Sequence, residues 1–197
     1  MAILIWPIEN STECTSDYRR QNRNYKNRNA VANVIYDITR QRVNEKQKNS
    51  LMTYEAMGCG YNLPAVDIIQ EFVYVQNVYD IDKRKGRRMC HELLSLTNEE
   101  VMALNFGYNL LLGVARDCAR WYFEQGYQVV FAIHHQGKWH IHFAVNSINY
   151  RDGRKFHTTK KEMQERQRLF NSILNKYILM AQSVVAPIYF ENNMEAQ

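Results

Sequence analysis

The stretch YQVVFAIHHQGKWHIHFAVNSI, residues Tyr127–Ile148, is the part of the sequence that decides the fold. Two runs rich in β-forming residues, YQVVFAIHH and WHIHFAVNSI, are separated by Gln136-Gly137-Lys138. A glycine in such a short connection can adopt the positive φ that a tight hairpin turn requires. The pattern therefore predicts an antiparallel β-hairpin.

Four of the 6 histidines lie in one stretch of nine residues, 134–142, within this hairpin. Because successive side chains of a strand point to opposite faces, His140 and His142 share one face. A three-residue connection sets His134 opposite His140 and brings a third imidazole to that face. A two-residue turn changes the parity and brings His135 there instead, so the third position stays open between these neighbours, and we favour His134.

Three neutral imidazoles on a rigid sheet can hold one side of a divalent ion and leave other positions open for substrate oxygens. His134, His140 and His142 are therefore candidate metal ligands. The alternative interpretation is that they are half-buried strand histidines that meet hydrogen-bond partners. Asn146 lies on the same face as His142, where it could orient a ligand, touch a substrate or cap the end of the strand.

The sequence on either side of the hairpin alternates between strand and helix periodicity. Strands are expected at Ala2–Trp6, Leu51–Met57 and Met89–Leu96. Helices are expected at Asn29–Thr39, from an N-cap at Asn62 to Gln76, from the capping-box pair Thr97 and Glu100 to about Gln125, and in a last amphipathic segment to about Met180. The order βαβαβαββα predicts an α/β fold in a single domain, residues 1–197, with antiparallel pairing at the hairpin.

Composition and charge limit the class of protein. The chain has 197 residues, of which 46% are hydrophobic and 12% aromatic, so it can build a packed core and is neither collagenous nor wholly disordered. Its net charge is 25 − 20 = +5. Tyr18–Lys48 contains nine basic and two acidic residues, which gives this stretch +7 and the rest of the chain −2. The positive charge therefore forms a patch.

The cysteines and the hydropathy indicate the compartment. The 4 cysteines are widely spaced and form no CxxC motif, which is typical of buried thiols in a reducing compartment. No apolar run approaches the ~20 residues that span a bilayer. We expect a cytoplasmic protein without membrane insertion.

Several segments together resemble a known family. The run HHQGKWHIHFAVNSINYRDGRKFHTT, residues 134–159, resembles the third motif of relaxases, the strand-transferring nucleases of conjugative plasmids and integrative conjugative elements. The segments MAILIWPI, NAVANVIYDIT, MGCGYNL and RRMCHELLSLTNEE occur in the order of a MobP-type relaxase domain of the HUH endonuclease superfamily. The resemblance covers nearly the whole chain. Relaxases commonly carry a C-terminal extension beyond this domain, so the chain is compatible with a longer protein.

The resemblance implies a five-stranded antiparallel sheet flanked by helices, with three histidines on a divalent metal ion, Mn or Mg. It implies metal-dependent, site- and strand-specific nicking and rejoining of DNA through a covalent 5'-phosphotyrosine intermediate, which initiates conjugative transfer. Expected partners are origin-of-transfer DNA as single strand and hairpin, accessory relaxosome proteins and the coupling protein of a type IV secretion system. Alternatives on the same fold are a non-catalytic origin-binding module and an HUH replication initiator or transposase.

The family's nucleophile is a tyrosine near the N-terminus, typically placed just before an Ile-Thr-like pair. Residues 35–39 of this chain are IYDIT, so Asp37 stands at that place and Tyr36 one position earlier. Tyr36 lies at the edge of the helix's buried stripe and is the expected nucleophile, with Tyr25 next. Tyr18, Tyr54 or no tyrosine at all are the remaining alternatives.

Basic residues away from the histidines are candidate DNA contacts, because lysine and arginine neutralise phosphates. They lie in the N-terminal stretch, in the KRKGRR turn and in the loop after the hairpin: Arg19, Arg20, Arg23, Arg28, Lys83, Arg84, Arg87, Arg151, Arg154 and Lys155. His91, on the third expected strand, is interpreted as a packed strand histidine or, at most, a support for the metal ligands.

Overall fold

The computed structural model describes residues 3–5, 25–41, 50–83, 85–105, 107–136 and 138–194. Its strands are β1 (Ile3–Ile5), β2 (Leu51–Met57), β3 (Met89–Ser95), β4 (Tyr127–Gln136) and β5 (Lys138–Asn149). Its helices are α2 (Ala30–Ile38), α4 (Ala65–Val78), α5 (Asn98–Ala103), α6 (Tyr108–Glu124) and α7 (Lys160–Met194), with a 3-10 turn η1 (Ile81–Lys83).

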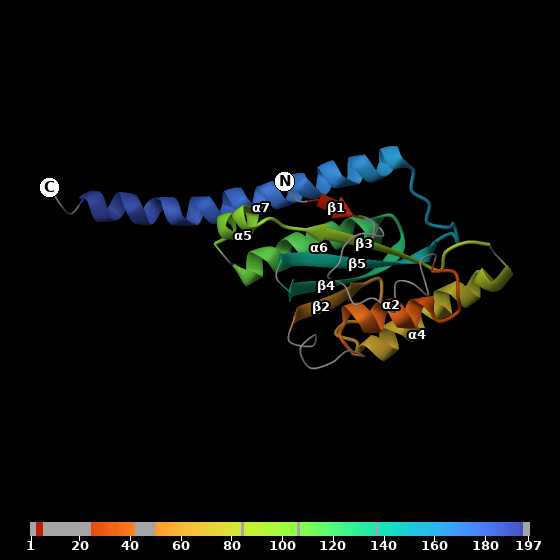
Figure 1. The fold of residues 1–197 in the computed structure, drawn as a ribbon. Coiled ribbons are helices and arrows are strands. Elements are labelled where there is room, and N and C mark those ends of the chain that lie inside the picture. Colours follow the sequence, from red (N-terminus) through yellow and green to blue (C-terminus); the bar gives the residue numbers. More distant parts are fainter. Residues whose placement is uncertain are drawn as a thin grey trace.

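These strands form an antiparallel sheet in the order β1-β3-β5-β4-β2. The β4–β5 hairpin lies at its centre, and β1 adds a three-residue edge beside β3. Helices α6 and α7 cover one face of the sheet, and α2 and α4 cover the other (Figure 1). The predicted α/β class, with an antiparallel sheet flanked by helices, is confirmed.

Alternate residues of the central hairpin enter two different cores. Phe131, Ile133 and Phe143 pack beneath α6 and α7 in a core rich in aromatic and large aliphatic side chains. Ala132 and Ala144 pack beneath α2 and α4, in a second core with several alanines. The three histidines at even-numbered positions share the parity of Ala132 and therefore face α2.

A buried ion pair fixes α7 to the sheet on the α6 side. Arg166 of α7 donates from Nη2 to Glu92 Oε1 at 2.5 Å and from Nε to Glu92 Oε2 at 3.0 Å. Tyr122 of α6 donates to the same carboxylate at 2.6 Å. Burial, followed by the Glu92 charge, raises the pKa of Tyr122 well above its usual value, so its hydroxyl keeps the proton that it donates. One carboxylate therefore ties β3, α6 and α7 together.

The long helix predicted from Thr97 to about Gln125 is wrong. The capping box of Thr97 and Glu100 is present, but α5 ends at Ala103, and Gly107 then becomes the N-cap residue of α6. Asn105 takes φ +52°, a left-handed conformation that no helix continues through. In the Asn-Phe-Gly sequence at 105–107, the asparagine ends one helix and the glycine allows the next to begin.

Two further boundaries differ from the prediction. Asn62 has φ +52° and is not the N-cap of α4, because that position belongs to Pro64. Helix α7 continues to Met194 rather than ending near Met180. Gly126, at φ +87°, follows the end of α6 as expected. Within the part of the chain that the structure describes, no helix combines the length and apolarity that crossing a bilayer requires.

Candidate metal centre

The β4–β5 register decides which histidines lie together. His134 pairs with His140, and Ala132 pairs with His142, as expected, although the strands extend to Gln136 and Lys138, which also pair, so the connection is shorter than the three residues predicted. His135 pairs with Trp139 and stacks on its ring with 4.4 Å between ring centroids, exposed on the opposite face. The expectation that His134 rather than His135 shares the face of His140 and His142 is therefore confirmed.

The three imidazoles lie close enough to share one ion. One ring nitrogen from each of His134, His140 and His142 lies within 4.8 Å of the others. His134 and His142 are buried, and His140 is half-buried, so the cluster opens toward solvent at His140. Among the described residues, this is the group of side chains with metal-ligand geometry.

Hydrogen bonds indicate which ring nitrogen can bind a metal ion in His140 and in His142. Nδ1 of His140 lies 2.9 Å from the carbonyl oxygen of Lys138, so Nδ1 carries the proton and Nε2 carries the lone pair. His142 has its Nδ1 2.8 Å from Nε2 of His91, while its own Nε2 is buried without a hydrogen-bond partner. A buried ring nitrogen with no partner beside two other imidazoles fits a metal ligand.

His134 is held by the end of α2. Its Nε2 lies 2.6 Å from the carbonyl oxygen of Ile38, and its Nδ1 lies 3.1 Å from Nη2 of Arg40. Burial, followed by the Arg40 charge, lowers the pKa of His134 to about 3. Burial, followed by the neighbouring His134, lowers the pKa of His142 well below its usual value. Both rings are therefore neutral at neutral pH, the state in which imidazole binds metals.

His91 links the cluster to a tyrosine. This β3 residue is 8% exposed and stacks on His142 with 5.0 Å between ring centroids. Its Nδ1 lies 3.3 Å from the hydroxyl oxygen of Tyr25, and its Nε2 lies 2.8 Å from His142. Tyr25 has φ +46°, and its carbonyl oxygen accepts a hydrogen bond from the backbone N–H of Arg88 at 2.7 Å. A continuous hydrogen-bonded row therefore runs from Tyr25 to the histidine cluster.

Two residues predicted to be catalytic, Tyr36 and Asn146, lie in the packing between the sheet and its helices. Tyr36 is half-buried and packs against the core between α2, α4 and the sheet. Asn146 is fully buried: it donates to Phe72 O at 3.1 Å and to Gln128 Oε1 at 2.8 Å, and it accepts from Gln76 Nε2 at 2.9 Å. Its amide joins α4 to the sheet in this structure, and a role of Asn146 in orienting a ligand or touching a substrate stays a prediction.

Several predicted DNA contacts gather around the start of β3, close to Tyr25. Arg28 and Arg88 both pair with Asp82, and the Arg28–Asp82 distance is 3.6 Å. Lys155, from the loop after the hairpin, donates to the carbonyl oxygen of Lys85 at 2.7 Å. Lys83 and Arg87 are exposed in the same segment. Three separate stretches of sequence thus bring positive charge to one end of the Tyr25–histidine row.

The other predicted DNA contacts either lie apart from this group or lie outside the described residues. Arg151 donates to the carbonyl oxygen of Glu124 at the end of α6, and Arg154 pairs with Asp152 at 3.4 Å. The remaining predicted contacts lie outside the described residues: Arg19, Arg20, Arg23 and Arg84.

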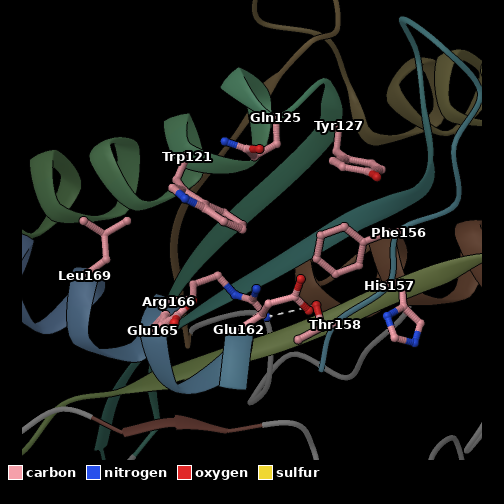
Figure 2. A pocket seen from close by; sticks show the side chains of 10 residues that line it. All are labelled: Trp121, Gln125, Tyr127, Phe156, His157, Thr158, Glu162, Glu165, Arg166 and Leu169. Carbon is pink, nitrogen blue, oxygen red and sulfur yellow. Dashed lines mark hydrogen bonds between the residues drawn. The ribbon is translucent and has the colours of Figure 1, made fainter. Parts of the chain in front are cut away.

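A pocket of about 350 Å³ lies on the opposite side of the sheet. Figure 2 shows Trp121 of α6, Tyr127 and Phe156 around it, and the side chain of Arg166, which extends from α7 and also lines it. The Arg166 guanidinium lies 5.1 Å from the centre of the Trp121 ring and is already bonded to Glu92. This pocket belongs to the junction of α6 and α7 and is separate from the histidine cluster.

An antiparallel sheet with three clustered histidines on one face could hold a divalent metal ion and leave other positions open for a substrate. The sequence matches the family model "Relaxase: MobA/VirD2-like, nuclease domain" over residues 22–179, so the chain belongs to that family. Two chains of solved structures match. One, described as "Molecular Basis of Vancomycin Resistance Transfer in Staphylococcus aureus", is 16% identical over 66% of this chain and 71% of its own, with a TM-score of 0.48. No curated protein matches.

Proposed function

We propose that this domain nicks and rejoins one strand of DNA at an origin of transfer, through a covalent tyrosine–phosphate intermediate that starts conjugative transfer. The observation that carries the proposal is the hydrogen-bonded row from Tyr25 through His91 to the three clustered histidines. A row of this kind brings a nucleophile and a candidate metal site together in one structure. Accessory relaxosome proteins and a secretion coupling protein are the partners that this role requires.

His134, His140 and His142 would hold a divalent ion, Mn²⁺ or Mg²⁺. When bound, such an ion polarises the scissile phosphate and offsets the negative charge that develops on it. The ligands themselves are supported by the protein: Lys138 fixes the ring of His140, and His91 fixes the ring of His142. Such supporting hydrogen bonds orient ligands and raise their basicity.

Tyr25 is the nucleophile that we favour, with Tyr36 as the alternative. If His142 uses Nε2 as a ligand, its Nδ1–H donates to Nε2 of His91, and Nδ1–H of His91 then donates to the phenol oxygen of Tyr25. That donor stabilises negative charge on the phenol oxygen as its proton leaves. The oxygen attacks phosphorus and forms the Tyr–O–P bond as the P–O3' bond breaks. The proton lost by the phenol ends on the departing 3' oxygen, which leaves as a hydroxyl; attack by that hydroxyl on the Tyr–O–P bond returns the proton to tyrosine and rejoins the strand.

The basic residues near Tyr25 would bind the phosphates on either side of the nick. Arg28 pairs with Asp82, Lys155 donates to the carbonyl oxygen of Lys85, and Lys83 and Arg87 are exposed in the same segment before β3. Phosphate contacts give affinity and orientation without reading the sequence. The proposal extends the same role to the other basic residues predicted from sequence: Arg19, Arg20, Arg23, Arg84, Arg151 and Arg154.

The test is a covalent-adduct assay on supercoiled plasmid that carries the element's own origin, followed by protease digestion and denaturing electrophoresis. We expect an adduct with the parent chain, its loss in Tyr25→Phe, and its persistence in Tyr36→Phe. The matched control is Tyr74→Phe, an exposed tyrosine on α4. His142→Ala should lower both Mn²⁺ affinity and nicking by orders of magnitude, since it removes a ligand.

The outcomes separate the alternatives. An adduct that vanishes in Tyr36→Phe and persists in Tyr25→Phe moves the nucleophile to α2. Specific origin binding without an adduct in the parent chain contradicts the enzyme and indicates a non-catalytic origin-binding module. Full nicking by His142→Ala in the presence of a chelator contradicts the metal site.

A further inference from the structure

Arg40 follows α2 and lies against the histidine cluster. Its backbone has φ +55°, a left-handed conformation that residues other than glycine and asparagine seldom adopt. Its side chain is 5% exposed, although it carries a full positive charge. A buried cation in a disfavoured conformation requires a physical reason, and its contacts supply one.

The guanidinium of Arg40 is only partly satisfied. Nη2 lies 3.1 Å from Nδ1 of His134. Nη1 lies 3.5 Å from the carbonyl oxygen of Asp37 and 3.7 Å from its carboxylate. Nε is buried and has no hydrogen-bond partner. An N–H donor therefore remains unsatisfied beside the cluster, and a buried donor without a partner is costly.

The contact with His134 also fixes the tautomer of that ring. A guanidinium can only donate, so Nδ1 of His134 must accept, and the carbonyl oxygen of Ile38 can only accept, so Nε2 must carry the proton. The lone pair available to a metal ion is therefore on Nδ1. Arg40 and a divalent ion compete for the same lone pair, and their positive charges repel each other.

We propose that Arg40 occupies the lone pair of His134 until a divalent ion binds, and that its displaced guanidinium then binds a nonbridging oxygen of the DNA phosphate. The inference rests on the proposed function and adds to it a phosphate-binding residue within the site. The planar fork of arginine suits a phosphate, and Nε is the donor without a partner that such an oxygen would satisfy. Asp37 stays beside Nη1 as the counter-charge from α2.

The first arm of the test measures Mn²⁺ binding to the metal-free protein by calorimetry. The variant is Arg40→Asn, because asparagine tolerates a positive φ and is too short to reach His134. We expect Mn²⁺ to bind at least about tenfold more tightly, since the competing cation is gone. Arg120→Gln is the matched control: Arg120 lies on α6, on the other side of the sheet, and should leave the affinity unchanged.

The second arm measures binding of a short single-stranded origin oligonucleotide to the Mn²⁺-loaded protein over a range of salt concentrations. Arg40→Asn should bind about tenfold more weakly, and the slope of log K against log salt should fall by about 0.7, the value for one phosphate contact on a single strand. Arg40→Lys keeps the charge and should restore the slope. Circular dichroism and thermal melting of each variant verify folding.

The signature is a pair of opposite changes, tighter metal and weaker DNA, that loss of structure alone would not produce. Unchanged or weaker Mn²⁺ binding in folded Arg40→Asn overturns the competition. Tighter Mn²⁺ with unchanged oligonucleotide affinity and slope overturns the phosphate contact. A parent chain that binds neither Mn²⁺ nor the oligonucleotide fails earlier, at the proposed function, and overturns both.

Discussion

The buried histidines predict how the stability of the metal-free protein depends on pH. His134 has its pKa lowered from the ordinary 6.5 to about 3, chiefly by burial and then by Arg40. Between these two values the unfolded chain binds a proton that the folded chain does not, so stability falls as the pH falls below 6.5. One pKa unit corresponds to about 1.4 kcal/mol. Lowering the pH from 7 to 5 should therefore cost about 2 kcal/mol from His134. His142, whose pKa is also lowered, adds to the loss.

Urea unfolding at pH 7 and pH 5, with a chelator present, measures this loss. The variant His134→Gln supplies one acceptor and one donor for Arg40 and Ile38 but does not titrate, so its pH dependence should be smaller than the parent's by about 2 kcal/mol. His135→Gln, exposed on the opposite face, is the control. If the free energy of unfolding depends on pH equally in the parent and in His134→Gln, the reasoning is refuted. Protonation of the buried His134 ring would then not be the cause of the loss of stability.

The other two predictions concern the ion pair of α7 and the basic residues near Tyr25. Glu92→Ala leaves the buried Arg166 without its carboxylate and should lower the free energy of unfolding by about 3–5 kcal/mol in urea titrations. Adding Arg166→Met should recover much of that loss, and an unchanged midpoint in Glu92→Ala would contradict the assigned pair. Arg87→Gln with Lys155→Gln should weaken binding to all single strands alike and flatten the salt slope by about 0.7 per contact, measured by fluorescence anisotropy. A loss confined to the origin sequence would mean that these residues read bases.

The hairpin could be predicted from sequence because its information is local. Once the connection has an odd number of residues, strand parity alone decides that His134 faces His140 and that His135 points away. The capping box at Thr97 is equally local, since both of its partners lie within one turn. The break before α6 also has a local signal, the Asn105 and Gly107 pair. The prediction of one long helix missed it because it relied on hydrophobic periodicity, which continues across Asn105.

His91 and Arg40 could not be assigned in the same way. His91 reaches His142 only because β3 pairs with β5, with Leu93 opposite His142, and nothing in either strand states that register. Arg40 reaches His134 only because α2 packs across the sheet and places its C-terminal end there. Both contacts depend on where separate elements dock. Their residue types were visible in the sequence, but their neighbours were not.

The two cores also explain why the histidines can lie where they do. On the α6 side, Phe131 and Phe143 pack in a core of large apolar side chains, and Arg166 neutralises the buried carboxylate of Glu92. On the α2 side, His142 lies opposite Ala132 and shares its strand with Ala144, so the imidazole ring has two small neighbours. The small side chains of Ala132 and Ala144 leave room for the rings. The end of α2 supplies the carbonyl oxygen of Ile38, which orients His134. The alternation of large and small residues along one hairpin therefore separates the face that stabilises this domain from the face where its chemistry is proposed.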